Sequence, residues 1–157
     1  MVLSGYRRDD YAGGISFGVF LILIAVFYIA NPNLLNEVTD FIRDFKLVPI
    51  SGDLSWFEPS SNHPILYEAA AEFCYIFGLV QVGVLAMMLA GRSSTRGKAR
   101  TFSGIIFWLG AGYAFGILSS GTLAWISFVG VLIILLGLSI VIRSAILFFA
   151  VRPNRQG

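Results

Sequence analysis

Four long apolar runs constrain this chain more than any other feature, because about 20 residues suffice to cross the hydrocarbon of a bilayer. They lie at about 12–31, 64–91, 101–119 and 122–143, with an alternative end of the last run at 151. Only 13% of the 157 residues are charged and 57% are hydrophobic, whereas soluble domains carry about 25% charged residues. This composition excludes a disordered chain, a nucleic-acid-binding domain and an ordinary cytosolic enzyme. We therefore predict an all-α integral membrane protein, a four-transmembrane-helix bundle in one domain covering residues 1–157.

The segment between the first two runs is not a plain loop. Apolar residues recur at helical spacing over about 33–46, with acidic and basic residues on the opposite side. This pattern predicts an amphipathic helix at the outer interface, with Asn33 as its N-terminal cap. Residues 47–63 contain Pro, Ser and Gly and are expected to form an outer loop.

Basic residues orient the chain, because short cytoplasmic loops of membrane proteins collect Lys and Arg. The segment 92–100 has four cations and no acid, so we expect it to be a cytoplasmic loop. With four spans, both termini then lie on the cytoplasmic side of the cell membrane. The cytoplasmic side would hold nine cations and two acids, and the outer side two cations and seven acids.

Two glutamates at the start of the second run form a candidate site. Glu68 and Glu72 stand four residues apart and share a helix face with Gly83 and Ala86. Small residues mark close helix contacts, so we expect this face to point into the bundle. Carboxylates in a membrane usually serve a pathway, which makes the pair, with His63, a candidate cation or proton site. The alternative is an interfacial position without function, since Glu72 falls at the outer edge of the hydrocarbon.

A buried amide gives a second candidate. Gln81 lies near the middle of the same run, roughly opposite the two glutamates and beside Phe77 and Met88. If this side points away from the bundle, these three residues would contact a second protomer or another subunit. A hydrogen-bond partner on the first or third run is the alternative.

Glycine spacing predicts where helices approach each other closely. The first and third runs each contain a GxxxG spacing, which permits such an approach, although glycine-rich spans often contain one by chance. The residues assigned to helix packing are Gly14, Gly18, Gly83, Ala86, Gly112 and Gly116.

No motif in the sequence indicates catalysis, a metal site or a cofactor. The single cysteine and single histidine exclude a zinc cluster and bis-histidine haem ligation within the chain. The outer loop 51–63 has the residue types of a Ser–His–Asp hydrolase but no motif that would position them. Those residue types are Ser51, Asp53, Ser55, Ser60, Ser61 and His63.

Three hypotheses about function follow. The leading one is a non-enzymatic structural or accessory subunit of a membrane complex, or a homo-oligomer, whose partners are lipids and other membrane subunits. The second is a small cation or proton channel or transporter that uses Glu68 and Glu72 at its outer mouth. A membrane-embedded hydrolase that uses the 51–63 loop is the most remote.

Overall fold

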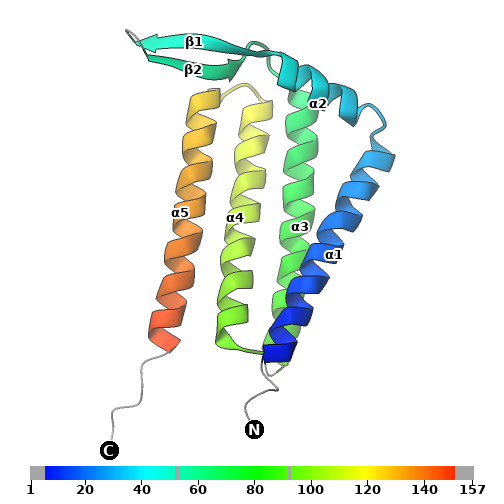
Figure 1. The fold of residues 1–157 in the computed structure, drawn as a ribbon, viewed down its shortest axis with the longest axis vertical. Helices are drawn as coiled ribbons and strands as arrows, with labels where there is room; N and C mark the ends of the chain where they lie inside the picture. The colour runs from blue at the N-terminus through cyan, green and yellow to red at the C-terminus, as the bar shows by residue number, and fades with distance from the viewer. Residues whose placement is uncertain (1–5, 52–53, 92, 151–157) are drawn as a thin grey trace, which may run out of the picture.

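The computed structural model shows four long helices that run side by side, with a short helix and a β-hairpin across one end (Figure 1). It describes the backbone of residues 6–51, 54–91 and 93–150, and the side chains of residues 14–49, 55–91 and 93–150. The elements are α1 (Tyr6–Ala30), α2 (Leu34–Arg43), β1 (Phe45–Ser51), β2 (Leu54–Pro59), α3 (Pro64–Ala90), α4 (Thr95–Ser119) and α5 (Trp125–Ala150). We call the end that carries α2 and the hairpin the hairpin end. The opposite end, where α4 begins and α5 ends, is called the basic end.

The helices have the length and composition of membrane spans. Among the described residues, α3, α4 and α5 are each long and apolar enough to cross a membrane. The segment Gly14–Ala30 and α2 meet that criterion only as a pair, which is bent by 96°, so the number of spans is three or up to four. The prediction of apolar helices compatible with a membrane is confirmed.

Helix ends follow local sequence signals. Pro64 is at the first turn of α3, where the absence of its N–H leaves no hydrogen bond unmade. Ser94 caps α4, because its hydroxyl accepts a hydrogen bond of 3.1 Å from the N–H of Gly97. The predicted basic loop 92–100 is therefore mostly helical, since Thr95 begins α4. The last helix continues to Ala150, close to the longer of the two predicted ends.

The prediction of a loop over residues 47–63 is wrong, because a two-stranded antiparallel hairpin fills most of it. Leu47 pairs with Phe57 and Val48 with Trp56. The amphipathic helix also ends earlier than residue 46, at Arg43, because Phe45 already belongs to β1. Asn33 precedes α2, but its side chain makes no capping hydrogen bond.

The bundle is held together by close packing between α3 and α4, in which glycines of each helix make room for side chains of the other. On α3 the buried residues include Tyr67, Cys74, Phe77, Gln81, Val84 and Met88. On α4 they include Gly97, Ala99, Ser103, Ala111, Gly112 and Ala114. Lipid tails are as apolar as these side chains, so close packing rather than the hydrophobic effect favours this contact.

Aromatic rings attach the remaining elements to the bundle. At the hairpin end Phe41 of α2 contacts Tyr67 and Trp125, with ring centroids 5.9 and 5.6 Å apart. Nearer the middle of the bundle, the ring centroid of Phe20 on α1 lies 5.5 Å from that of Phe77 on α3 and 6.3 Å from that of Trp108 on α4. Phe20 thus ties α1 to both α3 and α4.

Candidate functional site

The structure reverses the expected orientation of α3: the face with Glu68 and Glu72 points away from the bundle, and the face with Gln81 points into it. Glu68 and Glu72 are exposed on the face that turns away from the bundle, together with Gly83 and Ala86. Gln81 is buried, with 9% of its surface exposed, and Phe77 and Met88 are each 5% exposed. Gln81, Phe77 and Met88 therefore lie inside the chain's own bundle rather than on an outward surface.

The reason for this reversal lies on α4. Its glycines Gly104 and Gly112 leave room for Gln81 and Tyr75 of α3, so these large side chains can lie on the side of α3 that faces α4. A Cβ added at Gly104 would lie 2.6 Å from the amide oxygen of Gln81. A Cβ added at Gly112 would lie 3.1 Å from the ring of Tyr75 and 3.2 Å from the backbone oxygen of Ala71.

The other predicted packing glycines have open space beside them. No atom of another described element lies within 4 Å of a Cβ placed at Gly14, Gly18, Gly83 or Gly116. Of the two GxxxG spacings, only Gly112 therefore makes a close contact. Sequence reasoning did not single out Gly78 or Gly110, where an added Cβ would lie 2.8 Å from Leu109 and 2.6 Å from Leu135.

Three carboxylates line one pocket at the hairpin end, which we call the acidic pocket. Glu68 and Glu72 of α3 and Glu37 of α2 line a cavity of about 330 Å³, which also touches the bend between α1 and α2. Within the described residues, no basic side chain forms an ion pair with these glutamates, and no group of acidic, histidine or cysteine residues is arranged to hold a metal ion. The acidic pocket is therefore an open, negatively charged recess beside α3.

His63 does not join this acidic pocket. Its Nε2 lies 3.2 Å from Oδ2 of Asp44, the residue at the end of α2. The same carboxylate oxygen accepts hydrogen bonds from the hydroxyl of Ser61 at 2.6 Å and from its N–H at 2.7 Å. These two bonds to Ser61, and then the contact with His63, lower the pKa of Asp44 to about 2 from its usual 3.8.

This cluster does not have the geometry of a hydrolytic triad. In a triad the histidine lies between the carboxylate and the nucleophile and accepts the serine proton. Here the Ser61 hydroxyl donates directly to Asp44, so His63 is not placed as its base. Ser60 likewise donates from its hydroxyl to the backbone oxygen of Asp44, at 3.1 Å. The side chains of Ser51 and Asp53 lie outside the described residues.

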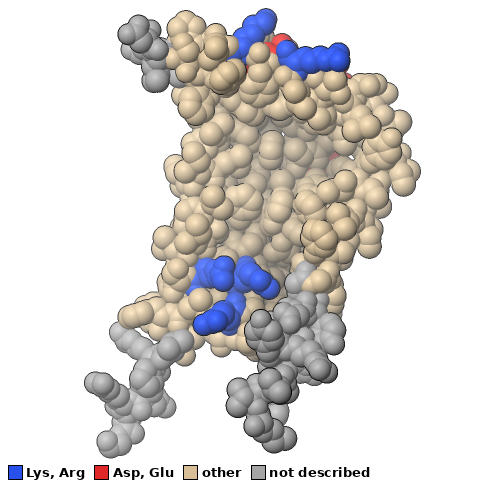
Figure 2. Space-filling model, viewed as in Figure 1, with Lys and Arg blue, Asp and Glu red and all other residues tan. Residues whose placement is uncertain are grey.

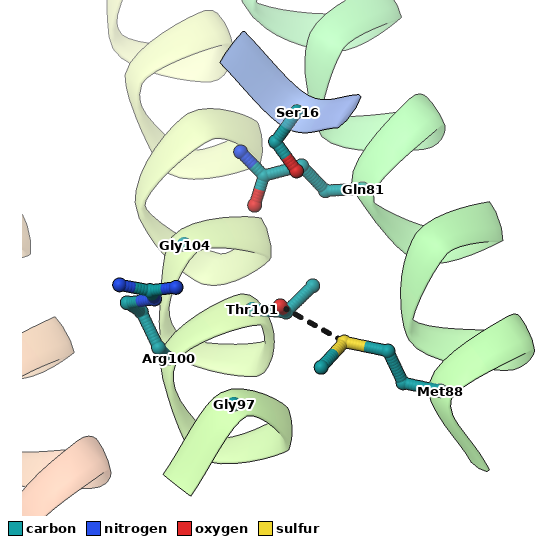
Figure 3. Close-up of a pocket in the computed structure, with 7 residues that line it drawn as sticks. All are labelled: Ser16, Gln81, Met88, Gly97, Arg100, Thr101 and Gly104. Carbon is teal, nitrogen blue, oxygen red and sulfur yellow. Dashed lines mark hydrogen bonds between the residues drawn. The ribbon is translucent and has the colours of Figure 1, made fainter. Parts of the chain in front are cut away.

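A polar pocket between α1, α3 and α4 was not predicted from the sequence (Figure 3). It has a volume of about 320 Å³ and lies in the half of the bundle nearer the basic end. We call it the Gln81 pocket, and its lining residues are Ser16, Gln81, Met88, Gly97, Arg100, Thr101 and Gly104. Figure 3 shows the Gln81 amide directed into the space between Ser16 and Gly104. The Thr101 hydroxyl points to the sulfur of Met88, 3.5 Å away.

Charge is distributed unequally between the two ends of the molecule. All acidic side chains that the structure describes belong to residues 37–72, near the hairpin end. The described basic side chains of the other half are Arg96, Lys98, Arg100 and Arg143. On the face drawn in Figure 2, Lys and Arg gather near these two ends and are absent from the middle of the bundle. The Gln81 pocket thus opens near a positively charged end.

Comparison with known proteins gives no relative from which a role could be transferred. No family model, no curated protein and no solved structure matches the chain. A function must therefore be inferred from the two pockets, the uncovered face of α3 and the distribution of charge.

Proposed function

We propose that this chain is a non-enzymatic integral membrane protein with four spans that acts as a subunit of a membrane assembly, in the first place with copies of itself. The fourth span in this proposal is α1. Its 25 residues extend about 37 Å at about 1.5 Å per residue, longer than the roughly 30 Å hydrocarbon layer, and it runs alongside α3 (Figure 1). Because Lys and Arg collect in the cytoplasm, the basic end and both termini face inward and the hairpin faces outward, across the cell membrane.

The observation that carries this proposal is the difference between the uncovered faces of α3 and α5. The exposed face of α5 consists mostly of large aliphatic side chains, which suit lipid, although Gly137 is also exposed. They include Ile133, Ile134, Leu136, Leu138, Ile140 and Val141. The uncovered face of α3 has two carboxylates near the hairpin end and, further along, Gly83, Ala86 and Ala90, with the exposed Leu79 between the two groups. Carboxylates and small residues are typical of helix faces that contact protein.

Charge supports a second copy as the occupant of this face. Glu68 and Glu72 are exposed at the hairpin end, and the described residues form no ion pair with them. Arg43 and Lys46 are exposed at the same end, also without an ion pair among the described residues. Copies that share one orientation in the membrane hold these opposite charges at the same level, where they favour association.

Disulfide cross-linking tests the proposal directly. In a Cys74→Ser background, Ala86→Cys places a thiol on the uncovered face of α3, and Ile134→Cys places one on the exposed face of α5 as a matched control. Mild oxidation in native membranes should give dimers from Ala86→Cys and not from Ile134→Cys. A cross-link from Ala86→Cys to a different protein would mean that the partner at this face is another subunit and not a second copy. Absence of any Ala86→Cys product, together with a monomeric mass in nanodiscs, would overturn the proposal.

A cation or proton pathway is the second candidate, and the acidic pocket favours it. Glu37, Glu68 and Glu72 line one cavity, and carboxylates placed at a membrane boundary attract cations. In an assembly of several copies, these glutamates would surround its outer mouth. Proteoliposome flux measured with potassium- and proton-sensitive dyes tests this function. Flux that is equal in wild type and in a Glu68→Gln, Glu72→Gln double variant would exclude it.

A further inference from the structure

The buried amide of Gln81 has no hydrogen-bond partner among the described residues. Only 9% of its surface is exposed, and its side chain is directed into the Gln81 pocket (Figure 3). A buried polar group without a partner is costly, so such a group is expected to bind something in the space it faces. The amide oxygen rests against Gly104, whose missing Cβ makes room for it.

Two further residues with donor groups line the same pocket from different helices, Ser16 of α1 and Arg100 of α4. Arg100 is exposed, and Figure 3 shows its guanidinium on the side of α4 away from Thr101. Neither has a hydrogen-bond or ion-pair partner among the side chains that the structure describes. Amide, hydroxyl and guanidinium groups together suit an acceptor with several oxygens, and the planar fork of arginine matches phosphate.

The charges around the Gln81 pocket favour a negatively charged ligand. The pocket lies beside the first turns of α4, where the helix dipole contributes partial positive charge. That first turn contains Arg96 and Lys98 and no acidic residue, and Arg100 is in the next turn. All acidic side chains that the structure describes lie in residues 37–72, and none of these lines the pocket.

The size and depth of the pocket also fit a small phosphate-bearing group. Its volume of about 320 Å³ is at the lower limit of ligand pockets, which span about 300–1,000 Å³. Arg100 is in the second turn of α4, which places it near the membrane boundary, where long basic side chains reach lipid headgroups. We propose that the Gln81 pocket binds a phosphate group through Arg100, Ser16 and the Gln81 amide. The phosphate would come from an anionic lipid headgroup or from a soluble phosphate ester.

Native mass spectrometry of the full chain, released from phosphatidylglycerol or phosphatidylcholine nanodiscs, tests the lipid source. Wild type should retain phosphatidylglycerol in preference to phosphatidylcholine. Arg100→Gln should weaken this retention about tenfold, the loss expected for a hydrogen bond to a charged group. Arg96→Gln is the matched control, because it removes the same charge from an exposed position of the same helix outside the pocket. Equal losses in both variants would mean a diffuse basic surface and would overturn the proposal.

Two variants without a charge change test the geometry of the pocket. Gln81→Leu removes the amide, and Gly104→Ala adds a Cβ 2.6 Å from the present position of the amide oxygen, which forces the side chain to move. Both should weaken retention while thermal unfolding in detergent stays cooperative and close to that of wild type. A folded Gln81→Leu protein with unchanged retention would contradict the assigned site.

The soluble source needs its own measurement. Wild type in an uncharged detergent is titrated with glycerol 3-phosphate and, separately, with inorganic phosphate, and thermal stability is recorded. Stabilisation that disappears in Arg100→Gln but persists in Arg96→Gln would assign the site to a soluble phosphate ester. If neither these anions nor phosphatidylglycerol binds in a way that depends on Arg100, the proposal is wrong.

Discussion

Ser61 donates two hydrogen bonds to one oxygen of Asp44, from its hydroxyl over 2.6 Å and from its backbone N–H over 2.7 Å. Asp44 ends α2 and Ser61 precedes α3, so the carboxylate connects the two ends of the chain segment that contains the hairpin. The N–H of Ser60 adds a bond of 3.1 Å to the backbone oxygen of Asp44. This cluster holds the hairpin over the bundle.

Replacement of Asp44 by asparagine should therefore loosen the hairpin. The charged acceptor for Ser61 and His63 is removed, so amide hydrogen exchange at Ser61 and proteolysis near the hairpin should become faster. Asp40→Asn is the matched control, because Asp40 is an exposed acid of the same helix whose carboxylate makes no hydrogen bond or ion pair with the described residues. Exchange at Ser61 that is equally slow in Asp44→Asn would show that the cluster does not hold the hairpin.

Acid should affect this cluster only at very low pH. The folded-state pKa of Asp44 is about 2, below the usual 3.8, so the charged carboxylate is favoured by folding. Its stabilising contribution is complete above about pH 4 and is lost as the pH falls through about 2. Hydrogen exchange at Ser61, corrected for the intrinsic pH dependence of exchange, should show no Asp44-linked change between pH 5 and 8. An Asp44-linked loss of protection near pH 5 would contradict the assignment.

The glycines of α4 differ in what surrounds them, and alanine substitution should separate them. Gly112→Ala places a Cβ 3.2 Å from a backbone oxygen of α3, where the neighbour has little freedom to move. We expect a loss of about 1–3 kcal/mol, as for other overpacked sites. Gly116→Ala meets open space and should be neutral or slightly stabilising, because alanine favours a helix by about 1 kcal/mol over glycine. Reversible unfolding in mixed micelles measures both, and equal effects would contradict the packing.

The orientation of α3 shows what the sequence pattern of this chain does not determine. Apolar length predicted the long helices, since hydrocarbon thickness imposes that length on any span. Helical spacing also correctly placed Glu68 and Gln81 on opposite sides of α3. It did not reveal which side faces the bundle, because lipid and protein interior are both apolar and hydrophobicity hardly distinguishes them. The deciding fact is the room that Gly104 and Gly112 leave on α4, which depends on three-dimensional contact.

The hairpin, in contrast, had a signal in the sequence. Residues 45–51 and 54–59 are separated by Gly52-Asp53, a dipeptide typical of two-residue hairpin loops. The apolar periodicity of α2 nevertheless continues through residue 46, because Phe45 also fits a helical spacing. Short apolar runs support either reading, and pairing between the two strands decided in favour of the hairpin. The Gln81 pocket had no such signal, because Ser16 and Arg100 are distant from Gln81 in sequence.

Phe20 is expected to hold α1 against the bundle. Its ring contacts Phe73 and Phe77 at 5.5 Å each and Trp108 at 6.3 Å. Phe20→Ala should destabilise this attachment by about 0.5–1.5 kcal/mol for each aromatic pair that the substitution removes. Phe17→Ala is the control, since Phe17 is 62% exposed on the same helix. Spin labels on α1 and α3 should show a broader distance distribution only in Phe20→Ala; identical distributions in both variants would refute the role of Phe20.

Single-cysteine labelling should reveal the orientation of the chain in the membrane. In a Cys74→Ser background, Ser55→Cys places an exposed thiol on β2 and Thr95→Cys places one at the start of α4. The cationic basic end should be cytoplasmic by the positive-inside rule. A membrane-impermeant maleimide should therefore label Ser55→Cys in intact cells, and Thr95→Cys only after permeabilisation. The wild-type protein is the control: its single cysteine, Cys74, is 4% exposed and should not react with the maleimide before or after permeabilisation. The reverse pattern would place the hairpin in the cytoplasm and would leave Arg96, Lys98 and Arg100 outside, away from the anionic lipids of the inner leaflet.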